Sequence, residues 1–422
     1  MIKIYKFGGA SIESSERVVQ VAKIIEQALD QKLCVVISAL GKTTNALEEI
    51  VFSYIENKLD VAKEKTLILK EKHNQYASSL VSKEISMIQE FIEDVFSTIY
   101  TIIEEPKEKE AAYYYDQIVS LGEILSTRII AQHLTENEIP NVWVDIREIL
   151  KTDNTYKDGV IFWEESLVNA LKEIKPLLDK KHVVITQGFI GSTFDMQNVT
   201  LGREGSDYTG AVLANLLDAK SLTIWKDVPS LLSADPKIFP NPTPIEEITY
   251  HEVIEMAYYG AQVIHPKTIK PLQNKSIPLY VKCFLDEKLP GTKIYNTPQK
   301  ISYPPLMVLK TKQVLLEVTT KDYSFITEKN LSSIYAYFYE SKLKINLIQN
   351  AAISFVACVD THEEKLQHLM KLLQTEYEIK RHDDLFLFTV RHYTQHALKE
   401  ELKNRKVLLT QKTPETIQLV VQ

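Results

Sequence analysis

Short apolar runs rich in valine and isoleucine recur through the first part of the chain, and they constrain the fold more than any other feature. Several of these runs are uninterrupted, which is typical of strands buried on both faces of a parallel sheet. Helical segments separate them, so the sequence predicts a three-layer αβα fold with a mainly parallel sheet and ligands over the carboxyl ends of the strands. The runs span residues 2–7, 33–38, 141–145, 182–187, 221–225 and 277–283.

The intervening segments show apolar stripes at helical spacing. The stripe from Val18 to Leu29 predicts one helix, with Ser15 as its N-cap. Residues 60–105 contain neither proline nor glycine, so we expect long helices there. Residues 119–134 repeat the pattern.

The pattern changes after about residue 305. Helical segments at 332–340 and 363–374 alternate with strand-like runs in a βαββαβ-like order, repeated roughly twice. This order predicts a C-terminal α+β region of ferredoxin-like type. All 12 glycines lie at or before Gly291, so ligand chemistry is expected in the first 291 residues. The C-terminal strand-like runs are 314–318, 344–348, 353–359, 385–390 and 417–421.

Composition excludes several classes of protein. The 422 residues carry a net charge of −7, which disfavours a sequence-independent nucleic-acid binder. Cys34, Cys283 and Cys358 lie far apart among apolar neighbours, which argues against a disulfide framework or a zinc site. No run is long enough to span a bilayer, and residues 1–7 alternate like a strand rather than a signal peptide. We therefore expect a cytoplasmic enzyme without nucleic-acid or membrane partners.

The segment from Gly202 to Gly210 concentrates reactive groups. It holds an arginine, two carboxylates, two hydroxyls besides tyrosine, and three glycines in nine residues. An apolar run follows at 211–217, so we expect a tight loop feeding a helix N-terminus, where free N–H groups favour an anion. Arg203 offers a fork matched to a carboxylate or phosphate. A solvent-exposed turn with scattered charges is the alternative, and the density of groups favours function over it.

Two further strand–loop–helix junctions suit anion binding. Lys6 lies near the end of the first run, and Gly8 and Gly9 follow that run, an arrangement that suits a polyphosphate. It is not a Walker A motif, because the lysine precedes the glycines, and a simple Gly–Gly turn is an equal alternative. Residues 38–45 follow the second run with hydroxyls and a glycine; taken alone, they fit an ordinary capped turn.

Glu123 interrupts an apolar helical stripe. A carboxylate there is costly to bury without a partner. It is either a solvated surface residue or a carboxylate that binds a substrate ammonium. After the run at 221–225, Asp227 and Lys237 enter a proline-rich loop, where they serve as nucleotide contacts or as structural caps.

The sequence offers no metal or nucleophile signature. His251 and Glu252 begin an HExxH pattern, but Glu255 occupies its fifth position, so the zinc-binding histidine pair is missing. No Ser/His/Asp or Cys/His arrangement is visible.

Several blocks, in this order along the chain, resemble the aspartate kinases of the amino-acid kinase family. The resemblance covers nearly all of residues 1–295, and the tail from about 305 resembles, more weakly, the paired ACT units that such kinases carry. The blocks are Lys6-Phe7-Gly8-Gly9-Ala10-Ser11, Ser38-Ala39-Leu40-Gly41 with Thr44-Asn45, Gly122-Glu123, Gly188-Phe189-Ile190-Gly191, Thr200-Leu201-Gly202-Arg203-Glu204-Gly205-Ser206-Asp207-Tyr208-Thr209, Trp225-Lys226-Asp227-Val228-Pro229 and Tyr259-Gly260-Ala261-Gln262-Val263-Ile264-His265-Pro266.

The resemblance implies a catalytic amino-acid kinase domain over 1–297 and a tandem ACT-like regulatory region over 305–422. It implies transfer of the ATP γ-phosphoryl group to the β-carboxylate of L-aspartate, giving 4-phospho-L-aspartate, the first step toward lysine, threonine and methionine. An attacking carboxylate is already ionised at neutral pH, so alignment and charge neutralisation carry the reaction. ATP and Mg²⁺ are the implied cofactors, with Mg²⁺ held mainly by phosphates and water rather than by protein ligands.

The resemblance also assigns roles to residues. Lys6 and Asp207 are the expected catalytic residues, Arg203 should hold the substrate α-carboxylate, and Glu123 its α-ammonium. The other expected substrate-binding residues are Ser38, Thr44, Glu204, Gly205 and Ser206. The expected nucleotide-binding residues, besides Lys6, are Phe7, Gly8, Gly9, Lys226, Asp227, Leu232, Lys237, Gln262 and Val263.

Four departures from the family pattern concern the nucleotide side. Ala10 and Lys226 stand where threonine is common, Leu232 where tyrosine is, and Gln262 where lysine is. In the tail, residues 346–352 contain no carboxylate, whereas lysine-inhibited relatives tend to carry acidic and hydroxyl residues there. An amino-acid effector is compatible with the tail, but inhibition by lysine is not expected.

Assembly and two other functions stay open. ACT-like units usually join sheets between chains, so we expect a homodimer or a dimer of dimers. A glutamate or acetylglutamate kinase is one alternative function, and the Arg-Glu-Gly-Ser-Asp loop and the tail argue against it. A non-enzymatic regulatory module is the other, and the complete aspartate-side set argues against that.

Overall fold

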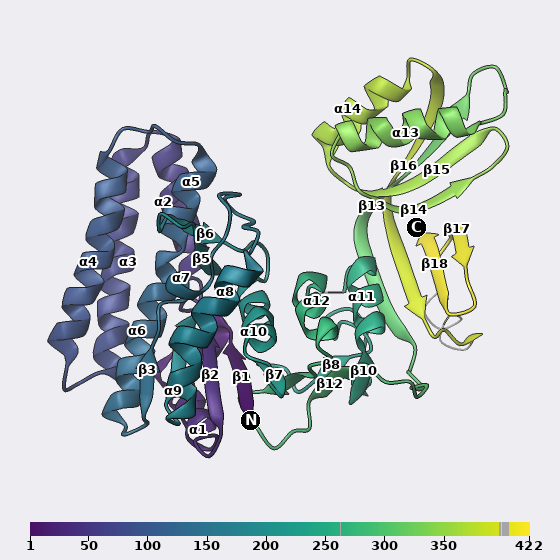
Figure 1. Ribbon diagram of the computed structural model, residues 1–422. Helices are drawn as coiled ribbons and strands as arrows, with labels where there is room; N and C mark the ends of the chain where they lie inside the picture. The colour runs from purple at the N-terminus through teal and green to yellow at the C-terminus, as the bar shows by residue number, and fades with distance from the viewer. Residues whose placement is uncertain (262, 396–397, 399–404) are drawn as a thin grey trace. The chain divides into compact units, whose positions relative to one another are not determined.

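The computed structural model describes residues 1–261, 263–395, 398 and 405–422 (Figure 1). The chain forms two compact units that are interleaved in sequence. The first unit comprises Met1–Leu231, Glu246–Ile254 and Ile264–Gln299. The second comprises Leu232–Ile245, Glu255–Val263 and Lys300–Gln422. The boundary expected between residues 297 and 305 stays a prediction.

The first unit is built on an eight-stranded sheet with the order β10-β12-β11-β7-β1-β2-β4-β3. Its described strand pairs are parallel except β11 with β12, so the mainly parallel sheet is confirmed. The sheet strands are β1 (Ile2–Phe7), β2 (Lys32–Ile37), β3 (Asn141–Trp143), β4 (Val183–Gln187), β7 (Ser221–Lys226), β10 (Glu247–Thr249), β11 (Leu279–Cys283) and β12 (Thr292–Tyr295). A short ribbon in this unit pairs β5 (Ile190–Ser192) with β6 (Asn198–Thr200). A second ribbon pairs β8 (Leu231–Leu232) with β9 (Pro244–Ile245), and all of it except Leu231 belongs to the second unit.

Helices cover both faces of this sheet. Consecutive residues of β2, β4 and β7 are buried, which requires cover on each side. Helices α6 and α10 pack directly on the strands, and the long helices α3 and α4 pack side by side (Figure 1). The helical segments are η1 (Gly9–Ile12), α1 (Ser15–Glu26), α2 (Thr43–Ile55), α3 (Leu59–Leu80), α4 (Ile85–Glu104), α5 (Ala111–Val119), α6 (Leu121–Glu136), α7 (Ile146–Ile149), α8 (Trp163–Asn169), η2 (Ala170–Ile174), α9 (Lys175–Asp179), α10 (Gly205–Leu216), α11 (Tyr250–Tyr259) and α12 (Pro266–Asn274).

One detail of the first helix differs from expectation. The N-cap of α1 is Ser14, whose side chain accepts the N–H of Arg17, whereas Ser15 is already helical. The helix ends at Glu26, so Leu29 lies beyond it in a turn. Either serine could cap by sequence alone, and the extended backbone of Ser14 decides between them.

The parallel register brings several strand ends to one edge. Phe7 of β1 is level with Ile37 of β2 and Trp225 of β7, and Ile37 is level with Gln187 of β4. The residues that follow these strands therefore lie along the same edge of the sheet. This is the edge where ligands bind in open parallel sheets.

The second unit is an antiparallel α+β structure, as expected. Its sheet has the order β14-β15-β13-β16-β18-β17, and α13 and α14 lie on one face of it (Figure 1). Leu316, Phe338 and Leu369, from a strand and the two helices, belong to the core between them. The elements are β13 (Leu306–Thr320), α13 (Glu328–Glu340), β14 (Ile345–Asn350), β15 (Ser354–Asp360), α14 (Glu363–Leu373), β16 (Tyr377–Arg391), β17 (Val407–Lys412) and β18 (Thr416–Val421).

Two segments from the middle of the chain also belong to this second unit. Phe239 stacks on Phe388 of β16, with ring centroids 5.8 Å apart. Glu255 pairs with the buried Arg391, with Nη1 and Oε2 3.1 Å apart. Residues from the middle of the chain therefore contact β16 of the C-terminal sheet. No helix in the described part of the chain is both long and apolar enough to cross a membrane.

Candidate active site

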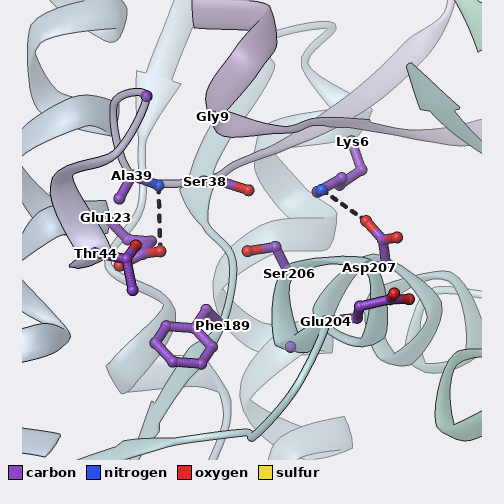
Figure 2. Close-up of a pocket in the computed structure, with 12 residues that line it drawn as sticks. Lys6, Gly9, Ser38, Ala39, Thr44, Glu123, Phe189, Glu204, Ser206 and Asp207 are labelled. Carbon is purple, nitrogen blue, oxygen red and sulfur yellow. Dashed lines mark hydrogen bonds and ion pairs between the residues drawn. The ribbon is translucent and has the colours of Figure 1, made fainter. Parts of the chain in front are cut away.

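A cavity of about 240 Å³ opens at the carboxyl edge of the parallel sheet (Figure 2). Its lining comes from the strand ends and the segments that follow them, from the first turns of α2 and α6, and from the start of α10. The lining residues are Lys6, Gly9, Ser38, Ala39, Gly41, Thr44, Glu123, Phe189, Glu204, Gly205, Ser206 and Asp207. All but Ala39, Gly41 and Phe189 were expected from the sequence. The structure thus gathers most of the expected substrate-side residues, and their roles stay predictions.

Glu123 supplies a buried carboxylate at one side of this cavity. Its residue is 2% exposed, so the solvated-surface alternative is wrong. Oε1 accepts the Ala39 N–H at 3.2 Å, whereas Oε2 is buried without a hydrogen-bond partner. Burial raises the pKa of Glu123 to about 8, against the opposing influence of the Ala39 N–H and the Lys6 charge. A buried carboxylate with a free oxygen can receive a cationic ligand.

Lys6 and Asp207 form an ion pair at the opposite side, with Nζ and Oδ1 2.6 Å apart (Figure 2). Their side chains are only 12% and 5% exposed. The ammonium also lies close to the Gly8 backbone, since a Cβ added there would be 3.4 Å from Nζ. A cation fixed beside a bare Gly–Gly turn can stabilise negative charge on a transferring group.

The start of α10 also lines the cavity, through Glu204, Gly205, Ser206 and Asp207. Glu204 adopts a left-handed conformation, with φ of 53°, and the helix begins at Gly205. The buried first-turn residues Ser206 and Asp207 follow, where backbone N–H groups lack partners within the helix. Close packing requires a glycine opposite, because a Cβ on Gly188 would lie 2.5 Å from the Ser206 Cβ.

Arg203 stands apart from the cavity lining. It is exposed in the turn before α10, and no described residue forms a hydrogen bond or ion pair with it. Its backbone is one residue from Glu204, which does line the cavity. The guanidinium is therefore available to a ligand, although the structure does not direct it inward.

The expected nucleotide residues are dispersed. In the first unit, Phe7 is fully buried and stacks on Trp225, so only its backbone can face a ligand. Lys226 is half-buried at the end of β7, and Asp227 is exposed just after it. Lys6, Gly8 and Gly9 also belong to the first unit, whereas Leu232, Lys237 and Val263 belong to the second. Gln262 lies outside the described residues.

Three contributors to the cavity were not assigned from the sequence. Ala39 and Gly41 follow β2, and Ala39 matters through its backbone N–H. Phe189 has a positive φ of 71° and lines the cavity beside Gly205. All three stand in blocks that resemble the family. The sequence does not reveal, however, that a backbone amide or an apolar ring at these positions contributes to the cavity.

The binding of Mg²⁺ through a nucleotide stays a prediction. Among the described residues, no group of three or more histidine, cysteine or acidic side chains could hold a metal ion. Mg²⁺ bound to phosphates needs few protein ligands, because it keeps much of its water. A nucleotide-borne Mg²⁺ is therefore compatible with this cavity.

Comparison with known proteins agrees with this geometry. The family model described as the amino acid kinase family matches residues 1–283. The chain is 30% identical to lysine-sensitive aspartokinase 3 of Escherichia coli over 373 residues, 85% of this chain and 78% of that protein. It is also 30% identical to chloroplastic aspartokinase 1 of Arabidopsis thaliana over 387 residues, 88% of this chain and 67% of that protein.

Solved structures extend the similarity to the whole fold. Aspartokinase III of Escherichia coli in complex with aspartate and ADP superposes with a TM-score of 0.78 at 26% identity, over 100% of this chain and 96% of that one. Its complex with lysine and aspartate gives 0.79 at 25% identity with the same coverage. The chain belongs to the amino acid kinase family and, within it, to the aspartokinases.

Proposed function

We propose that this protein is an ATP-dependent aspartate kinase that phosphorylates the β-carboxylate of L-aspartate. The observation that supports this most directly is the cavity between two charge sites. A carboxylate with a free oxygen, Glu123, lies at one side, and the Lys6–Asp207 ion pair lies at the other. A small amino acid can be held at its ammonium by the first site while its far carboxylate approaches the second.

Each end of the substrate then has a partner. Glu123 receives the α-ammonium, and Arg203 swings in to clamp the α-carboxylate. Ser38 and Ser206, between the charge sites in Figure 2, offer hydroxyls to the substrate. This arrangement leaves the β-carboxylate directed at Lys6.

Phosphoryl transfer needs no general base here. An oxygen of the ionised β-carboxylate attacks the γ-phosphorus of ATP, the bond to the β–γ bridging oxygen breaks, and ADP leaves with that electron pair. Lys6 and the N–H groups of Gly8 and Gly9 stabilise charge on the phosphoryl oxygens, and Asp207 holds the ammonium of Lys6 in place. Mg²⁺, bound to the nucleotide phosphates, would neutralise further charge.

The proposal is tested by trapping the acyl phosphate with hydroxylamine. Wild-type protein should give aspartyl hydroxamate from aspartate and ATP, and little product from glutamate or acetylglutamate. Arg203→Ala should lower kcat/KM for aspartate, because a paired charge contact is lost. The corresponding loss of transition-state stabilisation should be about 2–4 kcal/mol. Arg128→Ala is a suitable control, since that guanidinium lies over the Trp143 ring rather than at the cavity. An unchanged rate for Arg203→Ala, or turnover of glutamate without aspartate, would overturn the assignment.

Regulation by an amino acid stays open, and inhibition by lysine is possible but not expected. A second cavity, of about 430 Å³, lies in the C-terminal sheet and is lined by Ile348, Gln349, Asn350, Thr410, Gln411 and Lys412. This lining contains a cation and no carboxylate, so a lysine ammonium would lack a partner there. Activity assayed with added lysine, threonine or methionine separates these effectors, and strong inhibition by lysine would contradict this expectation.

Self-association is part of the proposal. The edge strands β14 and β17 have sheet partners on one side only within the described chain. Unpaired edges tend to be covered by another chain. We expect a homodimer or a dimer of dimers, and a monomer at micromolar concentration in light scattering would contradict this.

A further inference from the structure

We propose that Lys267 is a positioning residue for aspartate binding, acting through the loop that carries Arg203. This proposal rests on the proposed function and adds a residue from α12, which the family resemblance does not single out. The loop runs from Leu201 to Glu204, and the N-terminal end of α12 holds it at both ends.

The first attachment is made by Glu204. Its Oε2 accepts the backbone N–H of His265 at 2.9 Å, although the residue also lines the cavity. The ring Nδ1 of His265 in turn accepts the Lys267 N–H at 3.2 Å and caps α12. The C-terminal end of the loop is thereby joined to the first turn of α12.

The second attachment is made by the Lys267 ammonium. Nζ donates to the Leu201 carbonyl at 3.0 Å and to Asp158 Oδ1 at 2.6 Å, and it lies 4.9 Å from the centre of the Tyr208 ring. Asp158 also packs closely against the loop, since a Cβ added to Gly202 would lie 2.7 Å from Asp158 Oδ1. The N-terminal end of the loop is thus held by one cation and one carboxylate.

These contacts fix the backbone on either side of Arg203 while leaving its guanidinium free. Among the described residues nothing pairs with that guanidinium, so its reach is set by where the loop holds its backbone. The Lys267–Asp158 pair contributes little to global stability, because the Asp158 side chain is 71% exposed. Its effect should instead appear in substrate affinity, through a preorganised loop.

The chain supplies a matched control on the same pair of helices. Lys275, just after α12, donates to the Asn215 carbonyl of α10 at 2.7 Å and pairs with Asp218. It therefore makes the same two kinds of contact as Lys267, but at the far end of α10. Neither Lys275 nor its partners line the cavity.

The test compares Lys267→Met, Asp158→Asn and Lys275→Met by steady-state kinetics and by calorimetric titration with aspartate. Lys267→Met should raise the aspartate KM and Kd about five- to tenfold, with kcat and the ATP KM within about twofold of wild type. Lys275→Met should leave aspartate binding unchanged. Both lysine variants should show similar, small changes in Tm.

Asp158→Asn separates positioning from a simple charge effect. Removing a negative charge would strengthen binding of an anionic substrate if only the local field mattered. The positioning role predicts weaker binding, by about two- to threefold, because the ammonium of Lys267 loses its anchor. Tighter binding in Asp158→Asn, or an aspartate KM within about twofold of wild type in Lys267→Met, would refute the proposal. Those results leave the proposed function standing, whereas a wild-type protein that neither binds nor phosphorylates aspartate would refute that function itself.

Discussion

Replacing Glu123 with glutamine should stabilise the ligand-free protein while removing its activity. Glutamine keeps the acceptor for the Ala39 N–H but cannot carry the charge that the buried site disfavours. It also cannot pair with a substrate ammonium. Stability and activity are thus predicted to change in opposite directions at one residue.

The magnitude follows from the pKa of Glu123, which burial raises from an ordinary 4.5 to about 8. Between these values the folded protein retains a proton that the unfolded chain has released, so the free energy of unfolding falls as pH rises. The slope is about 1.4 kcal/mol per pH unit, so the wild type carries a penalty of about 3 kcal/mol at pH 7. The glutamine amide lacks an acceptor for its N–H groups, which costs about 1 kcal/mol and leaves a net gain of about 2 kcal/mol.

Urea unfolding followed by tryptophan fluorescence measures this gain. Trp143, Trp163 and Trp225 all belong to the first unit, so the signal reports on the unit that contains Glu123. The variant should be about 1 kcal/mol less stable than the wild type near pH 4.5, because only the cost of the amide remains there. The two should be equal near about pH 5, and the advantage of the variant should grow toward pH 8. A variant that is less stable than the wild type at pH 8, or a difference independent of pH, would refute the reasoning.

Glu136→Gln provides a control, because the pKa of Glu136 is shifted in the opposite direction to that of Glu123. Burial tends to raise the pKa of Glu136, but hydrogen bonds from Ser82, Glu84 and Lys83 lower it to about 2. The stabilisation from this carboxylate is present above its unfolded pKa and is lost as pH falls through about 2. The glutamine variant should therefore be less stable than the wild type at neutral pH.

Three other outcomes are expected. The aspartate KM should fall up to about tenfold per pH unit as pH rises from 6 to 8, because the substrate ammonium pairs only with the ionised form of Glu123. Initial rates measured across that range test this, and a KM that does not change with pH would contradict it. Asp116→Asn should lower the free energy of unfolding by about 2–4 kcal/mol in urea titrations, since its two oxygens accept three hydrogen bonds, two of them from Thr200, and an amide cannot accept all of them. Gly9→Ala should lower the free energy of unfolding by about 2–3 kcal/mol in the same assay, because the added Cβ would lie 2.8 Å from two backbone carbonyl oxygens. Gly8→Ala is its control and should be tolerated, because the added Cβ meets only the end of a lysine side chain, at 3.4 Å.

The parallel sheet could be predicted because consecutive residues of β2, β4 and β7 are apolar and buried, and because glycine or serine follows β1, β2 and β4. The C-terminal strands were harder to delimit. β13 and β16 each run for 15 residues, but the sequence marks only their apolar stretches. A register shift near Lys312, with φ of 54°, interrupts the pattern of β13. β17 was missed because most of its side chains are exposed.

The identities of site residues could be predicted better than their surroundings. Glu123 could be singled out from the sequence, but its burial and its contact with Ala39, 84 positions away, could not. Lys267 and Asp158 are 109 positions apart, and neither stands in an informative motif. Such contacts depend on the packing of α12 against the loop before α10, which hydrophobic periodicity does not encode.

The interleaving of the two units limits how freely the tail can be exchanged. A fragment ending at Gln299 would carry Phe239 without Phe388, and Glu255 without the guanidinium of Arg391. Such a fragment would expose apolar surface and tend to aggregate rather than behave as a self-sufficient enzyme. A tail grafted from another protein would need matching changes within residues 232–245 and 255–263. An exchange of the C-terminal region should therefore preserve folding only when these two segments are changed with it.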